Sequence, residues 1–371
     1  TREGMVETLR FQAEQRATDL LWRPMQVARR TARIVESHHP DQILIDHLAF
    51  ASSIGLRAID VPWADVVLGH PTAMPVRDEI YGVPSAWPPE LHPSSMDLDA
   101  LRATGRGVTE AFTSAYNETL TRLAPGAKPV DNAFGQHGDL VLYNYPRELH
   151  GPIREARLPR HAFLGSAVRQ ETADPDVLAW LKRPDTRPLV VISFGTFLSA
   201  RRDVLAKIAS SLKRVDARVA IAIGSATPDE LGDIPSDWLV RSTLPQVTLL
   251  ERADLLVTHG GNNSITEALT FGVPMLVMPF STDQFDGAAA VERSLAGVAL
   301  DPNSSPRSLI SGTVRGLLRN PPKSPAAIGE RLRREPGPEI AYAASSTLPP
   351  ITRTLPVADA PAPARTAVPT R

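Results

Sequence analysis

Residues 258–288 read THGGNNSITEALTFGVPMLVMPFSTDQFDGA. A short apolar strand, 255–258, ends just before two glycines, and a helix follows them. A second apolar strand, 275–278, runs into a further polar stretch. Glycine allows close backbone approach and unusual dihedral angles, and a helix N-terminus offers free N–H groups and a partial positive charge. This pattern predicts a site for a phosphorylated ligand.

Strands and helices alternate around this stretch, which predicts an α/β fold with doubly wound parallel sheets. The expected strands are 42–45, 139–143, 161–165, 189–193, 219–223, 238–240, 255–258 and 275–278. The expected helices lie within 5–36, 47–56, 97–123, 201–214, 246–252, 264–271, 284–296 and 306–319, and 60–95 is expected to be irregular.

The length of 371 residues suggests two domains at roughly 150 residues each. We expect an N-terminal domain over 1–168, a linker over 169–188 and a C-terminal domain over 189–335. Residues 336–371 are rich in Pro and Ala and should be a disordered tail, because they cannot bury enough apolar surface to offset their ordering entropy.

Composition excludes several functional classes. The net charge is -1, so nothing indicates binding to nucleic acid or to an anionic membrane. No apolar run approaches the roughly 20 residues of a membrane helix, so we expect no integral membrane segment. The chain has no cysteine, which excludes disulfides and thiolate nucleophiles, and a cytoplasmic location is our default expectation.

Polar residues follow three of the predicted strands, and in doubly wound sheets such exits converge on one crevice. His259 follows strand 255–258 and can donate a hydrogen bond to a phosphate, with Ser264 close behind. The alternative is that Ser264 and Glu267 form only a helix capping box. Asp283, which follows strand 275–278, is likewise open to interpretation as a helix N-cap.

The order of these residues resembles a known signature. Leu244-Pro-Gln246, His259-x-Gly261-x-Asn263-Ser264-x-x-Glu267, Gly272-Val-Pro274 and Asp283-Gln284 look like the donor motif of family 1 nucleotide-sugar-dependent glycosyltransferases. That resemblance implies the GT-B architecture, in which two Rossmann-like doubly wound domains face a cleft. It also implies a UDP- or TDP-sugar as co-substrate, no further cofactor and no metal.

The resemblance assigns a role to each donor-site residue. It places Gly195, Thr196, His259, Gly261, Asn263 and Ser264 at the diphosphate, Glu267 at the ribose, Leu244 and Gln246 at the base, and Asp283 and Gln284 at the transferred sugar.

Catalysis in such enzymes resembles an inverting displacement, in which a histidine near the chain start deprotonates the acceptor hydroxyl. Asp46 matches the aspartate that orients this histidine, and its alternative interpretation is a helix cap after strand 42–45. Residues 60–95, with Trp63, His70, Tyr81 and Trp87, are candidates to line the pocket of a hydrophobic acceptor.

The chain departs from the family pattern at its start. The Asp46 strand comes early by three strand–helix units, which at about 30 residues per unit is about 90 residues. We therefore expect an incomplete N-terminal domain. His38, His39 and His47 lack the expected loop context, so we assign no catalytic base.

Two further departures concern the donor motif. Thr243 occupies a position where the family often has a base-stacking Trp, which leaves uracil or thymine open. Asn262 replaces the Trp of the plant-type motif.

Two functional hypotheses follow. The first is a transferase that moves a hexose from a UDP- or TDP-sugar to a hydroxyl of a hydrophobic small molecule. The second is a non-catalytic nucleotide-sugar-binding protein that lacks the base. A sugar-nucleotide epimerase is disfavoured, because Pro245-Gln246 together with Asp283-Gln284 is typical of the transferases.

Overall fold

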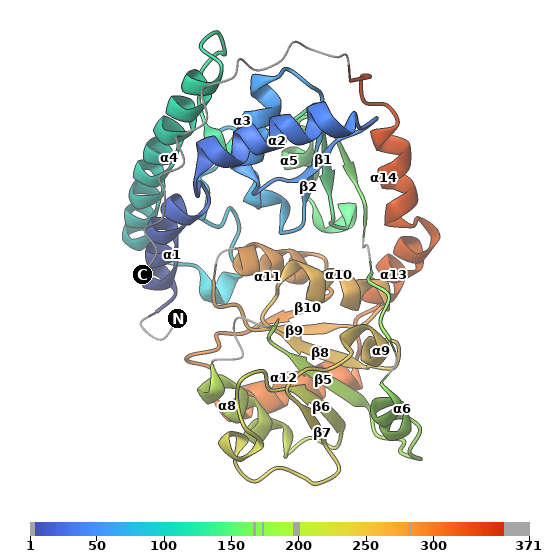
Figure 1. Ribbon diagram of the computed structural model, residues 1–371. Helices are drawn as coiled ribbons and strands as arrows, with labels where there is room; N and C mark the ends of the chain where they lie inside the picture. Colours follow the sequence, from blue (N-terminus) through green and yellow to red (C-terminus); the bar gives the residue numbers. More distant parts are fainter. Residues whose placement is uncertain (1–3, 166–167, 173, 196–200, 282, 352–371) are drawn as a thin grey trace, which may run out of the picture.

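The computed structural model describes residues 4–165, 168–172, 174–195, 201–281 and 283–351. These residues form two α/β domains, each built on a parallel sheet (Figure 1). The N-terminal sheet has the strand order β1-β2-β3-β4, and the C-terminal sheet has the order β10-β9-β8-β5-β6-β7. The expected α/β class and parallel pairing are confirmed.

The N-terminal domain carries helices on both sides of its sheet. Its elements are α1 (Met5–Asp19), α2 (Pro24–His38), β1 (Leu44–Asp46), α3 (Phe50–Ala58), β2 (Ala64–Val67), η1 (Pro71–Ala73), η2 (Pro89–Leu91), α4 (Ser95–Leu123), η3 (Ala133–Gly135), β3 (Leu140–Tyr143), η4 (Arg147–Leu149), α5 (Pro152–Glu155) and β4 (His161–Phe163).

Two expectations for this domain were wrong. The strand around 42–45 is not buried, because β1 lies at the edge of the described sheet and Leu44 is 46% exposed. The segment 60–95 is not irregular throughout, because β2 lies inside it and pairs with both β1 and β3. Strand β2 is only four residues long (ADVV), lies two residues after Pro62 and contains Asp65. It therefore lacks the apolar run by which the other strands were predicted.

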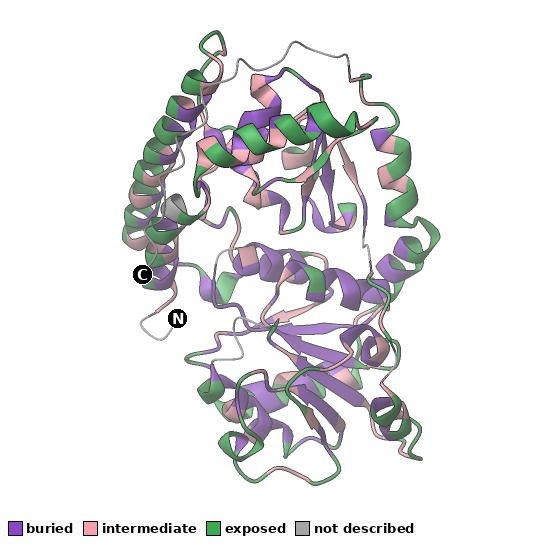
Figure 2. Cartoon of the chain, viewed as in Figure 1, coloured by how far each residue is buried: buried purple, intermediate pink, exposed green. Residues whose placement is uncertain are grey.

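The C-terminal domain follows the predicted alternation closely. Its elements are α6 (Pro175–Leu181), β5 (Leu189–Ser193), α8 (Arg202–Leu212), β6 (Arg218–Ala222), η5 (Pro228–Leu231), β7 (Leu239–Arg241), α9 (Gln246–Leu250), β8 (Leu255–Thr258), α10 (Asn262–Thr270), β9 (Met275–Val277), α11 (Asp283–Arg293), β10 (Gly297–Ala299), α12 (Arg307–Arg319), α13 (Ser324–Arg334) and α14 (Gly337–Ser345). Its central strands are buried (Figure 2), as expected for a parallel sheet covered on both faces.

The expected disordered tail is wrong for its first part. Residues 337–345 form α14, which returns to the N-terminal domain beside β4 (Figure 1). Ile340, Ala341 and Ala344 pack there against buried Leu140 and Leu142. The stretch has few large apolar residues, but small side chains are enough when they pack on an apolar sheet face. Residues 352–371 lie outside the described part of the chain.

The two domains meet through hydrogen bonds as well as apolar contacts. The Asn262 side chain, at the start of α10, donates to the carbonyl oxygens of Leu68 (2.7 Å) and Asn144 (2.9 Å). Both carbonyls lie just after strands of the N-terminal sheet. The contact therefore joins a helix start in one domain to two strand ends in the other.

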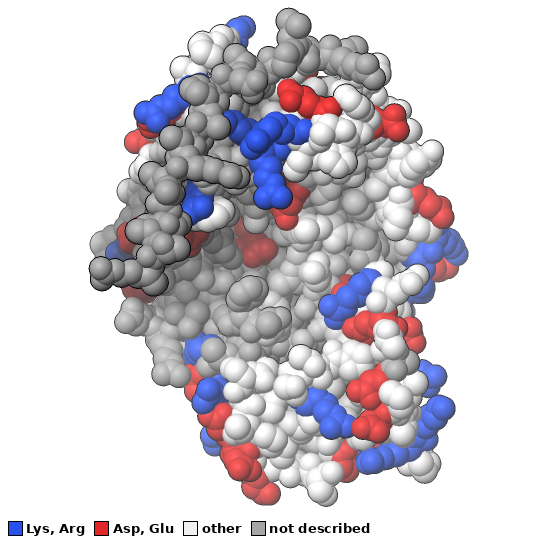
Figure 3. Space-filling model, in the orientation of Figure 1, with Lys and Arg blue, Asp and Glu red and all other residues white. Residues whose placement is uncertain are grey.

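Charged side chains of both signs are interspersed on the face shown in Figure 3, in keeping with the small net charge. Among the described residues, no helix is long and apolar enough to cross a bilayer.

Candidate functional site

A cavity of about 520 Å³ opens at the carboxyl ends of the C-terminal strands. The part of the N-terminal domain after β2 closes its other side with Leu68 and Gly69. Nine of the residues predicted for the donor site line this cavity, namely Gly195, Leu244, Gln246, His259, Gly261, Asn263, Ser264, Glu267 and Asp283. We call it the donor cavity. The convergence predicted from the strand exits is confirmed.

His259 is held between two glycines. A Cβ atom on Gly261 would lie 2.4 Å from His259 Nε2, and one on Gly195 would lie 3.1 Å from His259 Cε1. Gly195 also has a φ of +65°, where other residues are strained. These glycines thus make room for the imidazole ring, besides any approach of a ligand to the backbone.

Burial sets the protonation state of His259. It lowers the pKa of the imidazole to about 4, because the charged form is poorly solvated there. The ring is therefore neutral near pH 7, and it can present one N–H donor to an anion.

Helix α10 begins at Asn262, and its N-cap is Gly261, which has no side-chain cap. Ser264 and Glu267 therefore lie inside the helix, and the capping-box interpretation is wrong. The start of α10 borders the donor cavity, because Gly261, Asn262, Asn263 and Ser264 line it. The first N–H groups of a helix have no partner within the helix and suit an anion.

Glu267 joins two of the sequence motifs. Its Oε2 accepts a hydrogen bond from Gln246 Nε2 at 2.7 Å, and the same amide lies 3.4 Å from Ser264 Oγ. Burial raises the pKa of the Glu267 carboxyl. The pair is thus preorganised at the cavity wall, ready to accept hydroxyl donors.

Asp283 and Gln284 differ in placement. Asp283 lines the donor cavity, and its Oδ2 accepts a hydrogen bond from the His70 backbone N–H at 3.3 Å. Gln284 is turned inward, and its Oε1 accepts from the N–H groups of Phe280 (2.9 Å) and Ser281 (3.2 Å). Gln284 is not among the residues that line the cavity, so in this structure it shapes the turn before α11.

Thr196 lies outside the described residues, so its predicted position at the phosphates is not addressed by the structure.

Asp46 lines a second, smaller cavity of about 250 Å³. Its Oδ1 accepts from the Leu48 N–H at 2.9 Å and lies 3.4 Å from His47 Nδ1, which lowers the pKa of Asp46. The N-cap of α3 is Ala49, so the helix-cap interpretation of Asp46 is wrong. The lining of this cavity comprises Leu20, Asp46, His47, Leu48, Leu68, Gly69, Thr72, Ala73, Tyr81, Gly82, Val83, Pro84, Asp283 and Asp286.

The two cavities adjoin. Leu68, Gly69 and Asp283 line both of them, and a Cβ atom on Gly69 would lie 3.4 Å from Asp283 Oδ2. Asp283 therefore stands at the border of the two cavities. We call the smaller one the acceptor cavity.

Of the four residues proposed for the acceptor pocket, only Tyr81 lines the acceptor cavity. Trp63 donates its indole N–H to buried Asp65 (3.0 Å). His70 packs edge-on against Tyr145 with ring centroids 4.8 Å apart, and Trp87 lies 4.8 Å from Phe285 by the same measure. Aromatic residues in this segment are mostly ordinary packing.

Sequence reasoning missed several wall residues. Arg169, from the expected linker, lines the donor cavity, as does Ser242, beside Thr243, which the sequence had placed near the base. Leu68 and Gly69 follow β2, so recognising that strand would have indicated them as strand-exit residues. Asn262 was noted as a departure, although its role in joining the domains has no local sequence signal.

Comparison with known proteins agrees with this geometry. Residues 157–323 match the family model described as UDP-glucoronosyl and UDP-glucosyl transferase. The chain is 32% identical over 194 residues to the uncharacterized UDP-glucosyltransferase YojK of Bacillus subtilis (strain 168), covering 52% of this chain and 47% of that protein. It is 28% identical over 185 residues to demethyllactenocin mycarosyltransferase of Streptomyces fradiae, covering 49% of this chain and 40% of that protein.

Solved structures extend the similarity over most of the chain. The structure of the glycotransferase of kitacinnamycin superposes with a TM-score of 0.69 at 20% identity, covering 91% of this chain and 83% of that one. Glycosyltransferase VinC, solved in complex with DTDP, gives a TM-score of 0.66 at 17% identity, covering 92% of this chain and 81% of that one.

The fold and the donor cavity thus define a GT-B protein. Residues 157–323, which hold most of the donor cavity, match the UDP-glycosyltransferase family. The chain spans about half the length of the curated relatives it matches.

Proposed function

We propose that this protein binds a UDP- or TDP-hexose in the donor cavity and transfers the hexose to a hydroxyl group of an apolar small molecule in the acceptor cavity. The observation that carries this proposal is the meeting of the two cavities at Gly69 and Asp283. A sugar bonded to a diphosphate at His259 would reach toward Asp283, where an acceptor enters from the other side.

The donor diphosphate would be held by the open N-terminus of α10 and by the neutral His259 ring. Together they offer N–H donors and a partial positive charge where negative charge grows as the sugar departs. Glu267 would accept hydrogen bonds from the ribose hydroxyls. This arrangement supports a donor site that works without a metal ion.

The acceptor cavity has the chemistry for an apolar alcohol or phenol. Most of its wall is aliphatic, aromatic or glycine, and its polar side chains are few, namely Asp46, His47, Thr72, Asp283 and Asp286. The mycarosyltransferase among the similar proteins supports a natural-product acceptor.

The chemical step would be a single displacement. The acceptor oxygen bonds to the anomeric carbon as the bond from that carbon to the diphosphate oxygen breaks, and a base takes the hydroxyl proton. Entry of the two partners from opposite sides of Asp283 supports inversion. Asp46, at the acceptor cavity, would orient the base.

A second function, nucleotide-sugar binding without transfer, is favoured by one observation. His47 is the single histidine that lines the acceptor cavity among the described residues, and both its ring nitrogens are buried: Nδ1 faces Asp46 Oδ1 at 3.4 Å, and Nε2 has no hydrogen-bond partner there. As placed, it is not open to a substrate proton.

One experiment separates the two functions. The chain is titrated calorimetrically with UDP, TDP and their glucose conjugates without added metal, and it is then incubated with UDP-glucose and the fluorescent phenol 4-methylumbelliferone. Binding with glucoside formation supports the transferase. Binding without glucoside supports the non-catalytic function. A folded chain that binds none of the four nucleotides refutes both.

A further inference from the structure

The wall of the acceptor cavity is largely one segment, which we call the acceptor loop (residues 68–86). Eight of its residues line the cavity, namely Leu68, Gly69, Thr72, Ala73, Tyr81, Gly82, Val83 and Pro84. Within these residues the only helix is the single-turn η1 (Pro71–Ala73). A segment with so little regular structure needs other contacts to hold its shape.

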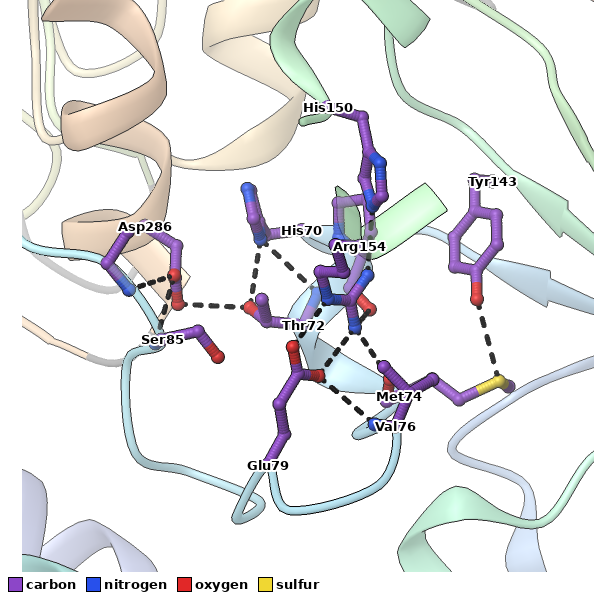
Figure 4. Close-up of polar contacts among 12 residues, drawn as sticks. His70, Thr72, Met74, Val76, Glu79, Ser85, Tyr143, His150, Arg154 and Asp286 are labelled. Atoms are coloured by element: carbon purple, nitrogen blue, oxygen red, sulfur yellow. Dashed lines mark hydrogen bonds and ion pairs between the residues drawn. The ribbon is translucent and has the colours of Figure 1, made fainter. Parts of the chain in front are cut away.

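The N-terminal domain, to which the loop belongs, anchors one side of it. The Arg154 guanidinium pairs with Glu79 (Nε to Oε1, 2.7 Å) and donates through Nη2 to the carbonyl oxygens of Pro71 (3.1 Å) and Met74 (3.0 Å). Figure 4 shows the contacts of Arg154 with Glu79 and Met74. They fix the conformation of the loop but say nothing about its position relative to the donor sugar.

Asp286, on α11 of the C-terminal domain, anchors the other side of the loop. Its Oδ1 accepts from the backbone N–H groups of Ser85 (3.0 Å) and Ala86 (2.9 Å), and its Oδ2 accepts from Thr72 Oγ1 (3.0 Å). Figure 4 shows the carboxylate of α11 reaching these groups. One side chain therefore joins the two ends of the acceptor loop to a helix of the other domain.

Stability alone is a poor explanation for this carboxylate. Asp286 is 2% exposed, and no cation contacts its carboxylate among the contacts that the structure describes. Burying a carboxyl group costs free energy that an apolar residue at the same place would not cost. The carboxyl group instead fixes the position of the loop relative to α11, because three donors of the loop converge on its two oxygens.

The position of Asp286 on α11 is the decisive feature. It lies three residues after Asp283, so the two side chains project from neighbouring turns of one rigid helix. Asp283 lines both cavities, and Asp286, which also lines the acceptor cavity, holds the acceptor loop. The helix that faces the sugar thus carries its own link to the segment that faces the acceptor.

We propose that Asp286 is a positioning residue for glycosyl transfer, which sets the acceptor loop at a fixed distance from the sugar held at Asp283. The inference rests on the proposed function. Misplacing one reactant by about 1 Å can cost about a hundredfold in rate. Loss of Asp286 should therefore impair use of the acceptor while leaving the nucleotide site intact.

The test compares Asp286→Ala and Asp286→Asn with the wild type. Transfer from UDP-glucose to 4-methylumbelliferone is measured with each substrate varied, and UDP affinity is measured by calorimetry. Asp286→Ala is expected to raise the acceptor KM at least tenfold and to leave the UDP Kd within twofold. Asp286→Asn keeps an oxygen for the two N–H donors, so its acceptor KM should stay within threefold of the wild type.

Asp65→Ala is the matched control. Asp65 is also 2% exposed and accepts two N–H donors, from Trp63 Nε1 (3.0 Å) and Gly138 N (2.6 Å), but it lines neither cavity. It should lower the melting temperature comparably and leave both KM values within twofold. Should Asp286→Ala fail to fold, Thr72→Val removes one of the three contacts and should raise the acceptor KM about threefold.

The outcomes are distinct. A folded Asp286→Ala variant with unchanged acceptor KM, or with equal losses for donor and acceptor, overturns the inference. If the wild type binds UDP but transfers no sugar, the affinity for 4-methylumbelliferone is measured by fluorescence in the presence of UDP instead. Asp286→Ala is then expected to bind the phenol at least tenfold more weakly than the wild type. A wild type that binds no nucleotide overturns the proposed function itself.

Discussion

The donor and acceptor cavities are built in different ways. The core of the donor cavity comes from one short stretch, in which a strand, two glycines and a helix start bring His259, Ser264 and Glu267 together. The acceptor cavity draws on residues from Leu20 to Asp286, which lie on both domains. Local backbone geometry forms the core of the first cavity, which Leu68 and Gly69 then close from the other domain, whereas the wall of the second is assembled from distant segments. Four variants test this contrast.

The largest expected effect concerns the buried carboxyl group at the domain boundary. Burial raises the pKa of Asp286 from 3.8 to about 7, so the folded state keeps the proton while the unfolded chain releases it. Stability therefore falls as pH rises from about 4 to about 7. The free energy of unfolding of Asp286→Asn minus that of the wild type should rise by roughly 3 kcal/mol over this range.

Urea unfolding at pH 4, 5.5 and 7 measures this difference. Groups common to both proteins, such as Asp65, cancel in it. A difference that stays constant with pH would show that Asp286 is ionised in the fold like an exposed carboxylate.

The second effect tests the local character of the donor cavity. His259→Ala should weaken UDP binding by about 1–3 kcal/mol, because a buried hydrogen bond to a charged phosphate is lost. Binding of 4-methylumbelliferone should stay within twofold, since His259 does not line the acceptor cavity. Calorimetry with both ligands decides, and unchanged UDP affinity would remove His259 from the donor site.

The third effect tests the docking of the domains. Asn262→Ala removes the donors to the carbonyls of Leu68 and Asn144, and it should lower the free energy of unfolding by about 1–2 kcal/mol. The neighbouring Asn263 is exposed, so Asn263→Ala should change stability by less than about 0.5 kcal/mol. Equal effects of the two variants would mean that Asn262 does not hold the interface.

The smallest effect separates ligand binding from helix stability. Glu267→Gln should weaken UDP binding by about 1 kcal/mol, because an amide accepts fewer hydroxyl donors than a carboxylate. Thermal stability should be nearly unchanged, since Glu267 caps no helix. A lower melting temperature with unchanged UDP affinity would assign Glu267 a structural role through Gln246 instead.

Much of the donor cavity could be predicted because its signals are short in sequence. Apolar strands, glycines at 195 and 261, and polar strand exits each act within a few residues, and the parallel sheet then collects them at one edge. Gln284 shows the limit of this reasoning. Its place after a strand matched the sugar position, yet the turn at Phe280 and Ser281 needed its amide oxygen.

The elements that were mispredicted share a different cause. Strand β2 and helix α14 have weak local patterns, and each is stabilised by surfaces distant in sequence: β2 by pairing with β1 and β3, and α14 by the face around Leu140. Local propensity is a weak prior where tertiary packing supplies most of the free energy.

Local sequence patterns were enough to predict the α/β class, the donor motif and the glycines that surround the neutral imidazole of His259. These follow from periodicity and from glycine stereochemistry, which act over a few residues. Only the tertiary structure decided that Asp283 stands where two cavities meet and that Asp286 ties the acceptor loop to α11. Both facts depend on how two domains dock, and hydrogen bonds between residues some 200 positions apart leave no periodic trace in the chain.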